Sequence, residues 1–182
     1  SFDLLAPLVN LGPIYAIDLP GHGLSEHLSK SSHYHFIDGV THLCLLIKAL
    51  QLKHCVLVGH SLGACLASIA AGILGPQVTK LVLLDGIGPL TSLAGKSAAR
   101  LSNYLLKLNT LSRKPKRYYQ SVDEAIQARA SRGYLSFELA KHIVKRGVKR
   151  SEQGFFWRHD NRLLLPSSLR MPEAQVLSFL KE

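Results

Sequence analysis

The chain has 182 residues, and its hydrophobic content of 47% is enough for one packed domain. No stretch approaches the roughly 20 uninterrupted apolar residues that a membrane span needs, and no signal peptide opens the chain, so we expect a cytoplasmic protein without a membrane span. The formal net charge of +10 is uneven, because residues 1–90 carry four Lys/Arg and five Asp/Glu whereas residues 91–182 carry eighteen and seven.

A basic half of this kind is typical of proteins that bind nucleic acid or an anionic surface. We favour a solvated helical surface instead, because the basic residues fall on the polar faces of predicted helices without an aromatic stacking platform. We therefore expect no nucleic-acid partner.

Three cysteines, Cys44, Cys55 and Cys65, fall at positions that we expect to be buried in helices or strands. Their odd number and the lack of a C-x-x-C spacing favour small core residues in a reducing compartment over disulfides or metal ligands. No other group of residues has metal-ligand spacing, so no metal site is expected.

Predicted strands and helices alternate in the first half, which indicates βαβ units and a parallel sheet. The first segment, residues 2–11, resembles the end of a helix. Buried strands are expected at 14–17, 55–58 and 80–84, helices at 36–52 and 62–74, and a glycine-punctuated loop at 18–25.

The second half is predicted to be mainly helical. One helix is expected over 93–111, a second from the capping box Ser121-Val122-Asp123-Glu124 toward residue 131, and a third from Ser136 to Gly147. Residues 154–165 are expected to contain a short hairpin, and a last amphipathic helix begins at Pro172.

Residues 56–64 carry the strongest functional signal and read Val-Leu-Val-Gly-His-Ser-Leu-Gly-Ala. A G-x-S-x-G motif between a strand and an Ala-rich helix is the nucleophile elbow, in which Ser61 stands on a tight, strained turn. We expect Gly59 and Gly63 to be glycines because a Cβ at either position would collide with the neighbouring strand or helix. The backbone N–H of Leu62, at the amino end of the helix, is the expected oxyanion donor.

These residues resemble the α/β-hydrolase fold superfamily, through Asp-Leu-Pro-Gly-His-Gly-Leu-Ser at 18–25, Gly-His-Ser-Leu-Gly at 59–63 and Leu-Val-Leu-Leu-Asp at 81–85. Details such as Trp-Arg-His-Asp at 157–160, followed by Arg162 and Leu163, are most similar to the serine hydrolase-like branch. The resemblance implies an α/β fold with a partial parallel sheet flanked by helices over 1–89, and a mainly helical cap over 90–182.

The resemblance also implies that this chain is an internal piece of a longer hydrolase. The family orders its triad as Ser, acid, His, and the acid and His commonly follow strands that would lie after the cap. The strand and His-Gly loop that normally supply the second oxyanion N–H would lie before residue 1, and the chain also begins without Met. We therefore expect the nucleophile here without its base, and an isolated chain that is inactive.

Asp85 follows the third predicted strand, where some members of the superfamily place their acid. A turn carboxylate is the favoured reading of this residue, and the catalytic acid is the alternative. No histidine is favoured as the general base: His60 adjoins the serine on the elbow and points away from it, His22 is expected to hold its glycine loop by hydrogen bonds, and His142 and His159 fall in the cap.

The leading hypothesis is a serine hydrolase that acts on a small ester or related acyl substrate through an acyl-enzyme on Ser61. Such chemistry needs no cofactor, and none is expected. The alternative is a truncated, non-catalytic hydrolase-like domain with a binding or interaction role. Binding of nucleic acid or an anionic surface ranks last, and the sequence gives neither the substrate nor the oligomeric state.

Overall fold

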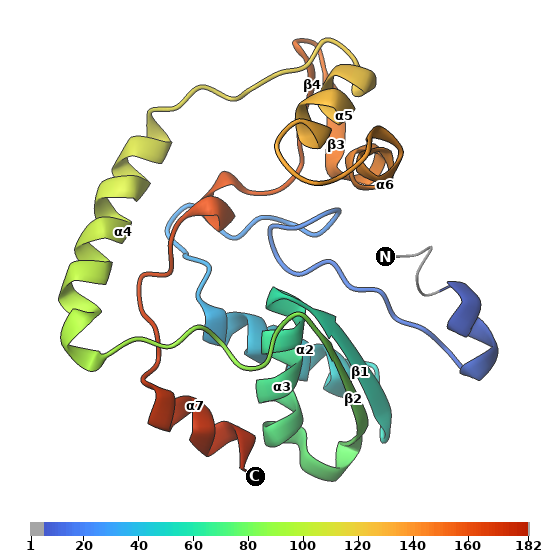
Figure 1. Cartoon of the computed structure of the whole chain (residues 1–182), viewed down its shortest axis with the longest axis vertical. Helices are drawn as coiled ribbons and strands as arrows, with labels where there is room; N and C mark the ends of the chain where they lie inside the picture. Colours follow the sequence, from blue (N-terminus) through green and yellow to red (C-terminus); the bar gives the residue numbers. More distant parts are fainter. Residues whose placement is uncertain (1–5, 182) are drawn as a thin grey trace. The chain divides into compact units, whose positions relative to one another are not determined.

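The computed structural model describes residues 6–181 (Figure 1). The chain forms two compact units, and each is assembled from segments that are distant in sequence. The sheet unit comprises Lys30–Lys114 and the residues from Asn161 onward, and the hairpin unit comprises the residues up to Ser29 and Pro115–Asp160. The predicted division into a core over 1–89 and a cap over 90–182 stays a prediction about the whole protein.

The sheet unit contains two strands and four α-helices. They are α2 (Phe36–Ala49), β1 (Cys55–His60), α3 (Leu62–Leu74), β2 (Val78–Leu84), α4 (Ser97–Ser112) and α7 (Glu173–Leu180), with short 3-10 turns at Gly75–Gln77, Ala94–Lys96 and Asn161–Leu164. The helix predicted over 62–74 is found with these bounds, and the strands predicted at 55–58 and 80–84 are confirmed and slightly longer.

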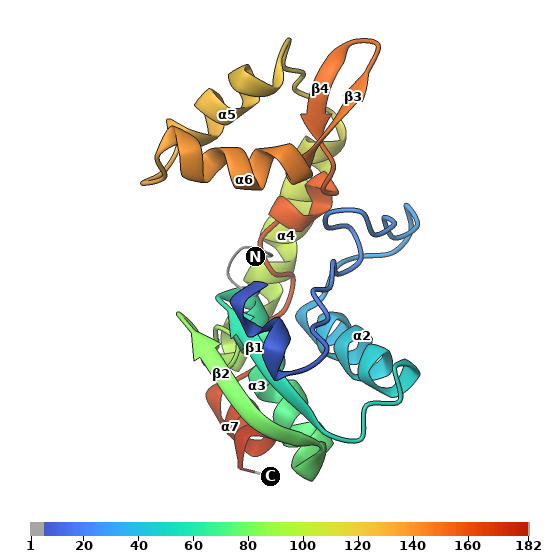
Figure 2. The same cartoon turned by 90° about the vertical axis from the view of Figure 1, so that its right-hand side faces the viewer.

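Helix α3 is the centre of the sheet unit. It packs on β1 and β2, on α2 and on α7 (Figure 2). Its Ala64, Ile69 and Ala70 are fully buried. Small residues allow this close approach. A Cβ at Gly72, for example, would overlap the carbonyl oxygen of Phe179 in α7. The apolar side chains of α3 therefore hold the sheet and two helices together.

Strands β1 and β2 are parallel, with Val58 opposite Val82 and His60 opposite Leu84. In-register residues of parallel strands project to the same face of the sheet. One face carries Val56, Val58, Val82 and Leu84, and each of these side chains is exposed by between 41% and 52%. Helix α3 covers the opposite face, so this sheet has one face packed on a helix and one face of exposed apolar side chains.

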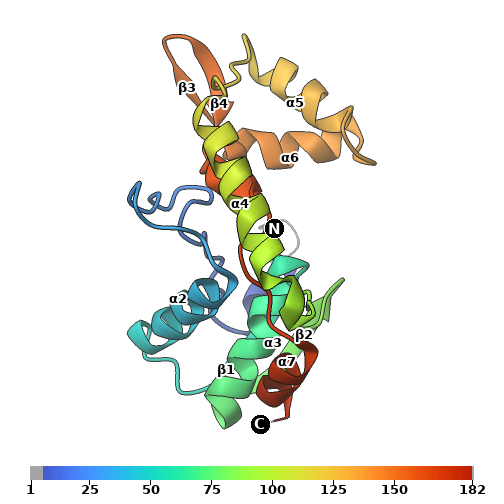
Figure 3. The same cartoon turned by 90° about the vertical axis from the view of Figure 1, so that its left-hand side faces the viewer.

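The hairpin unit contains the 3-10 helix η1 (Ala6–Leu11), α5 (Val122–Ala130), α6 (Phe137–Gly147) and an antiparallel hairpin of β3 (Val148–Ser151) and β4 (Gly154–Trp157). Helices α5 and α6 pack together (Figure 3). The core of the unit is apolar and joins both helices to the hairpin through Tyr119, Ala125, Ile126, Ala140, Val144 and Val148.

Both predicted helix caps in this unit are confirmed. The Oγ of Ser121 accepts a hydrogen bond from the Glu124 N–H at 3.0 Å, and the Oε2 of Glu124 accepts one from the Gln120 N–H at 2.6 Å. The Oγ of Ser136 accepts from the Leu139 N–H at 3.3 Å. The hairpin expected within 154–165 is displaced: only β4 lies in that range, its partner β3 precedes it, and residues 158–165 form no strand.

Three expectations need correction. Residues 14–17 form no strand, because no strand of the described chain pairs with them. The segment predicted to end a helix at 2–11 forms a 3-10 helix over Ala6–Leu11, and residues 2–5 lie outside the described part. The three cysteines are half-buried rather than core residues; burial still raises the pKa of each thiol. Over residues 6–181, no helix has the length and apolar character needed to cross a membrane.

Candidate active site

Ser61 occupies the turn between β1 and α3 in a strained backbone conformation. Its φ is 50° and its ψ is −115°, which is a conformation that side chains with a Cβ rarely adopt. Two hydrogen bonds fix this turn. The N–H of Ser61 donates to the Leu84 carbonyl at the end of β2 over 2.9 Å, and its carbonyl accepts from the Cys65 N–H over 3.1 Å. The side chain of Ser61 is exposed.

The two motif glycines have different reasons to be glycine. A Cβ at Gly59 would overlap the backbone of Gly63 and Ala64, as expected for the strand that enters the turn. A Cβ at Gly63 would meet nothing within 4 Å, so the prediction of a collision at this position is wrong. Gly63 is already inside α3, and its missing side chain points to open space in this structure.

The amino end of α3 lies directly beside the nucleophile. Leu62 is the first residue of the helix, and the first N–H groups of a helix have no partner within it. Together with the helix dipole, they favour negative charge at this end. The Leu62 N–H therefore lies at the positive end of the helix dipole, and its role as an oxyanion donor stays a prediction.

Asp85 follows β2 immediately, and β2 is the neighbour of β1, the strand that leads into the elbow. Because the carboxyl ends of parallel strands lie at one edge of the sheet, Ser61 and Asp85 emerge at the same edge. Asp85 is exposed and has a positive φ of 55°, which is unusual for a residue other than Gly. Among the described residues, its carboxylate makes no hydrogen bond or ion pair, and so none with the Ser61 hydroxyl.

The loop after Asp85 contributes residues that the sequence analysis did not single out. A Cβ at Gly86 would come within 3.0 Å of the Ser61 carbonyl oxygen, so Gly86 allows the loop to approach the elbow. The loop is held by Ser68 of α3, which is 3% exposed. Its Oγ accepts from the Gly88 N–H at 2.9 Å and donates to the Cys65 carbonyl at 2.9 Å. The Asp-Gly-Ile-Gly-Pro pattern at 85–89 marks a tight loop, but a serine within an apolar helix gives no such signal.

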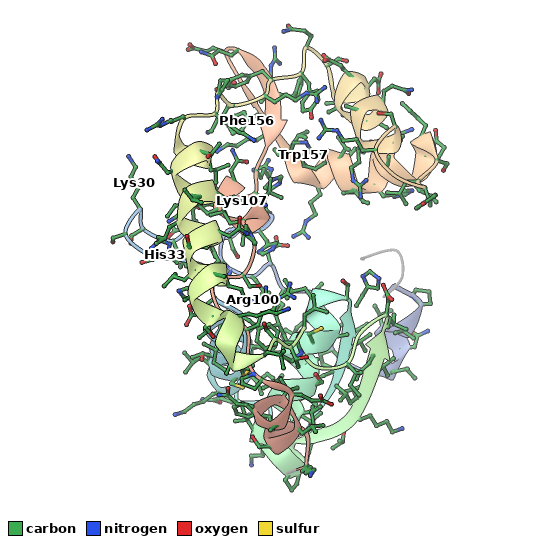
Figure 4. All side chains as sticks on the ribbon, turned by 60° about the vertical axis from the view of Figure 1, so that its left-hand side comes forward. Lys30, His33, Arg100, Lys107, Phe156 and Trp157 are labelled. Atoms are coloured by element: carbon green, nitrogen blue, oxygen red, sulfur yellow. The ribbon has the colours of Figure 1, made fainter. Side chains whose placement is uncertain are left out.

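No histidine of the sheet unit, within its described residues, hydrogen-bonds to Ser61. His60 is exposed at the end of β1. His33, which lies beside α4 in Figure 4, hydrogen-bonds to the Tyr104 hydroxyl at 2.7 Å. His35 hydrogen-bonds to the Ser168 hydroxyl at 3.1 Å. The structure therefore identifies no general base next to the nucleophile.

The other candidate histidines belong to the hairpin unit. His22 lies with its Nδ1 3.2 Å from the Pro20 carbonyl, so its predicted role in holding the glycine loop is confirmed. His159 is half-buried, and its pKa is lowered by burial and, to a smaller extent, by the nearby His22 and His27. Asp160 opposes this shift and lies 3.6 Å from His27. His142 lies on α6, away from this group in sequence.

An apolar groove lies between α2 and the end of α3, at the other end of the strands from Ser61. It is lined by Val40 and Cys44 of α2, by His54 before β1 and by Pro76 before β2. These positions precede the strands, whereas Ser61 follows one. The groove therefore lies toward the amino ends of the strands and is not the site of the nucleophile.

Comparison with known proteins identifies the fold to which this elbow belongs. The family model described as the alpha/beta hydrolase family matches residues 1–174. The chain belongs to the α/β-hydrolase family. The strained serine between β1 and α3, and the parallel pairing of β1 with β2, are the parts of that fold which the sheet unit contains.

The relatives found among curated proteins are serine hydrolase-like proteins. One from Dictyostelium discoideum is 32% identical over 190 residues, covering 100% of this chain and 53% of the relative. Another from Danio rerio is 28% identical over 187 residues, covering 100% of this chain and 57% of the relative. The chain thus spans just over half the length of the curated relatives it matches.

Solved structures show the same fold. A hypothetical protein from Pseudomonas aeruginosa PAO1 is 34% identical with a TM-score of 0.82, covering 90% of this chain and 58% of that protein. A thioesterase domain from the curacin biosynthetic pathway is 26% identical with a TM-score of 0.70, covering 90% of this chain and 57% of the domain. Both similarities extend through the sheet and the region that follows it.

Proposed function

We propose that this protein is a serine hydrolase that acts on a small ester or related acyl substrate through an acyl-enzyme on Ser61. The observation that supports this most strongly is the strained backbone of Ser61, with φ 50° and ψ −115° at the start of α3. Strain of this kind costs about 1–3 kcal/mol and persists where it has a use. Serine as the nucleophile also argues against the chemistry of relatives that place a carboxylate at the elbow.

In the proposed reaction, the Oγ of Ser61 attacks the acyl carbon while its proton passes to a general base. The negative charge that forms on the carbonyl oxygen is stabilised by the Leu62 N–H and the amino end of α3. The leaving group then departs with a proton from the base, and the acyl group remains on Ser61. Water attacks this ester in the second half of the reaction and releases the carboxylic acid.

We propose a histidine as the general base, and none of the described histidines of the sheet unit hydrogen-bonds to Ser61. Asp85 is the proposed acid partner of that histidine, because it emerges at the same sheet edge as Ser61 and its carboxylate is exposed there. The acid would orient the imidazole and stabilise its protonated form.

The absence of a base beside Ser61 also favours a second candidate, a non-catalytic hydrolase-like binding domain. The two candidates differ in what the isolated chain does with an activated ester. Turnover by the 182-residue chain that is abolished in Ser61→Ala would exclude the non-catalytic function. If the isolated chain shows no turnover, the natural protein must be tested to distinguish the two functions.

The decisive experiment on the natural protein is active-site labelling with a fluorophosphonate, which reacts only with activated serines. The proposal requires an adduct on Ser61 and loss of that adduct in Ser61→Ala. Ser68 is a control within the same helix, because its hydroxyl is buried and engaged and should remain unlabelled.

A further inference from the structure

The outer face of the hairpin unit combines lysine side chains with aromatic rings. Lys149 of β3 lies opposite Phe156 of β4, and a bridge between Tyr119 and Phe155 adds a third short segment beside β4. Because side chains alternate along extended segments, Tyr118 and Lys116 fall on the face of Phe156, and Tyr119, Phe155 and Trp157 fall on the opposite face. The latter three residues pack into or against the core, so the first face is the outer one.

The contacts on this outer face are close. The Nζ of Lys116 lies 4.5 Å from the centroid of the Phe156 ring, and the Nζ of Lys149 lies 5.0 Å from it. The Tyr118 ring meets the Phe156 ring edge-on, with centroids 5.7 Å apart. Both lysines are exposed, and both rings are half-buried. Figure 4 labels Phe156 next to Trp157 on β4.

The positive charge of this face comes from its two lysines. Arg117 lies over the Tyr119 ring at 4.9 Å, and Arg150 pairs with Phe155, so alternation places both arginines on the opposite face. Glu152 lies in the hairpin turn, and the carboxylate of Glu124 accepts the Gln120 N–H. Two ammonium groups therefore lie against one aromatic ring. Basic residues were expected on helices without aromatic neighbours, and Lys116 and Lys149 are exceptions.

From these contacts we propose that the outer face, which we call the Lys116/Lys149 face, binds the surface of an anionic phospholipid membrane. Lysines at an anionic lipid surface are attracted to the phosphate and carboxylate headgroups, and aromatic rings favour the depth of those headgroups. The π-surface of Phe156 is already covered by ammonium groups, so a nucleic-acid base cannot stack there without displacing them. Lysine also lacks the planar fork with which arginine recognises individual phosphates.

The test measures sedimentation of the 182-residue chain with vesicles of phosphatidylcholine that contain about one quarter phosphatidylserine. Each lysine near such a surface contributes about a fivefold factor in partitioning, so Lys116→Gln/Lys149→Gln should bind about 25-fold more weakly. The matched control is Lys141→Gln/Lys145→Gln on α6, which changes the net charge equally and should keep the affinity. Binding should be lost on phosphatidylcholine alone and should weaken steeply with added salt.

Several outcomes would overturn the proposal. Equal binding by the two double variants would mean that net charge and not the Lys116/Lys149 face is responsible. No binding of the unmodified chain to phosphatidylserine vesicles would also exclude it. If an oligothymidylate bound more tightly than the vesicles and depended on the same lysines, the face would be a nucleic-acid site instead. Unchanged thermal unfolding of both double variants ensures that lost binding is not lost folding.

Discussion

At the scale of single residues, the backbone of Ser61 is held in an unfavourable conformation, which we relate to the proposed role of this serine as the nucleophile. Its φ of 50° and ψ of −115° form a backbone conformation that has a lower energy for glycine than for serine. We predict that Ser61→Gly raises the free energy of unfolding by about 1 kcal/mol while removing the nucleophile. Ser61→Ala keeps a Cβ and should give no such gain. Urea unfolding of the three proteins tests this, and equal stability of the glycine and alanine variants would show that the turn is unstrained.

The two glycines of the elbow offer a matched pair of substitutions. Gly59→Ala should destabilise the chain by about 1–3 kcal/mol, because its Cβ would overlap the backbone of Gly63 and Ala64. Gly63→Ala should be neutral or stabilise by up to about 1 kcal/mol, because its Cβ meets nothing within 4 Å and the residue is helical. Thermal or urea unfolding would decide, and a larger loss at Gly63 than at Gly59 would contradict the structure.

Residues of the site differ in how far the sequence predicts them. Ser61 and Leu62 are predictable because the elbow is local: a strand, a tight turn and a helix follow one another along the chain. Gly86 and Ser68 are not, because their roles arise from contacts between segments about 20 residues apart. The collision predicted at Gly63 failed for the same reason, since it depends on which element lies opposite the helix.

At the scale of elements, the capping interactions give a graded prediction. Ser121 makes a 3.0 Å bond to the Glu124 N–H, and Glu124 returns one to Gln120, whereas Ser136 makes a single 3.3 Å bond. Ser121→Ala should therefore cost about 1 kcal/mol of stability, and Ser136→Ala less. Chemical unfolding monitored by Trp157, the single tryptophan, reports on the hairpin unit that contains both caps. A larger cost at Ser136 would contradict this ranking.

Helices with local signals were predicted well, and strands depended on their partners. Helix α3 has the bounds expected from its apolar pattern, and α5 and α6 begin after their predicted caps. The apolar run at 14–17 reads as a strand but forms none, because a strand exists only with a hydrogen-bonded neighbour. Periodicity shows which residues prefer extended backbone and does not show whether a neighbour is present.

At the scale of the whole molecule, the grouping of distant segments into one unit could not be predicted from the sequence. The hairpin unit joins the 18–25 loop to residues after Pro115, through the ion pair of Asp18 with Arg146 at 2.7 Å and the bond from the Asp160 N–H to the Gly21 carbonyl at 2.9 Å. Such pairings follow from tertiary packing, which no local pattern reveals. The α/β class itself was predictable, because alternating strands and helices imply parallel pairing.

The stability of the hairpin unit should decrease at acidic pH. The pKa of His159 is lowered below its ordinary 6.5 by burial, so the folded state favours the neutral ring. This contribution to stability is complete above pH 6.5 and is lost as the pH falls from there toward the lowered pKa. The facing groups act in opposite directions: protonated His22 and His27 add repulsion, whereas Asp160 attracts.

The corresponding experiment follows urea unfolding through Trp157, whose ring lies 5.8 Å from that of His159. The unmodified chain should lose stability below pH 6.5, and His159→Gln should lose less over the same range. His42→Gln on α2, in the sheet unit, is the control and should follow the unmodified chain. Identical pH profiles for all three proteins would exclude a role for His159.

The central claim is that Ser61 is an activated nucleophile, and it is tested most directly by fluorophosphonate labelling of the protein isolated from its native source. Peptide mass spectrometry should find the adduct on the peptide that contains Gly59-His60-Ser61-Leu62-Gly63 and on no other serine. A folded protein that leaves Ser61 unlabelled would contradict the account and favour the non-catalytic binding domain.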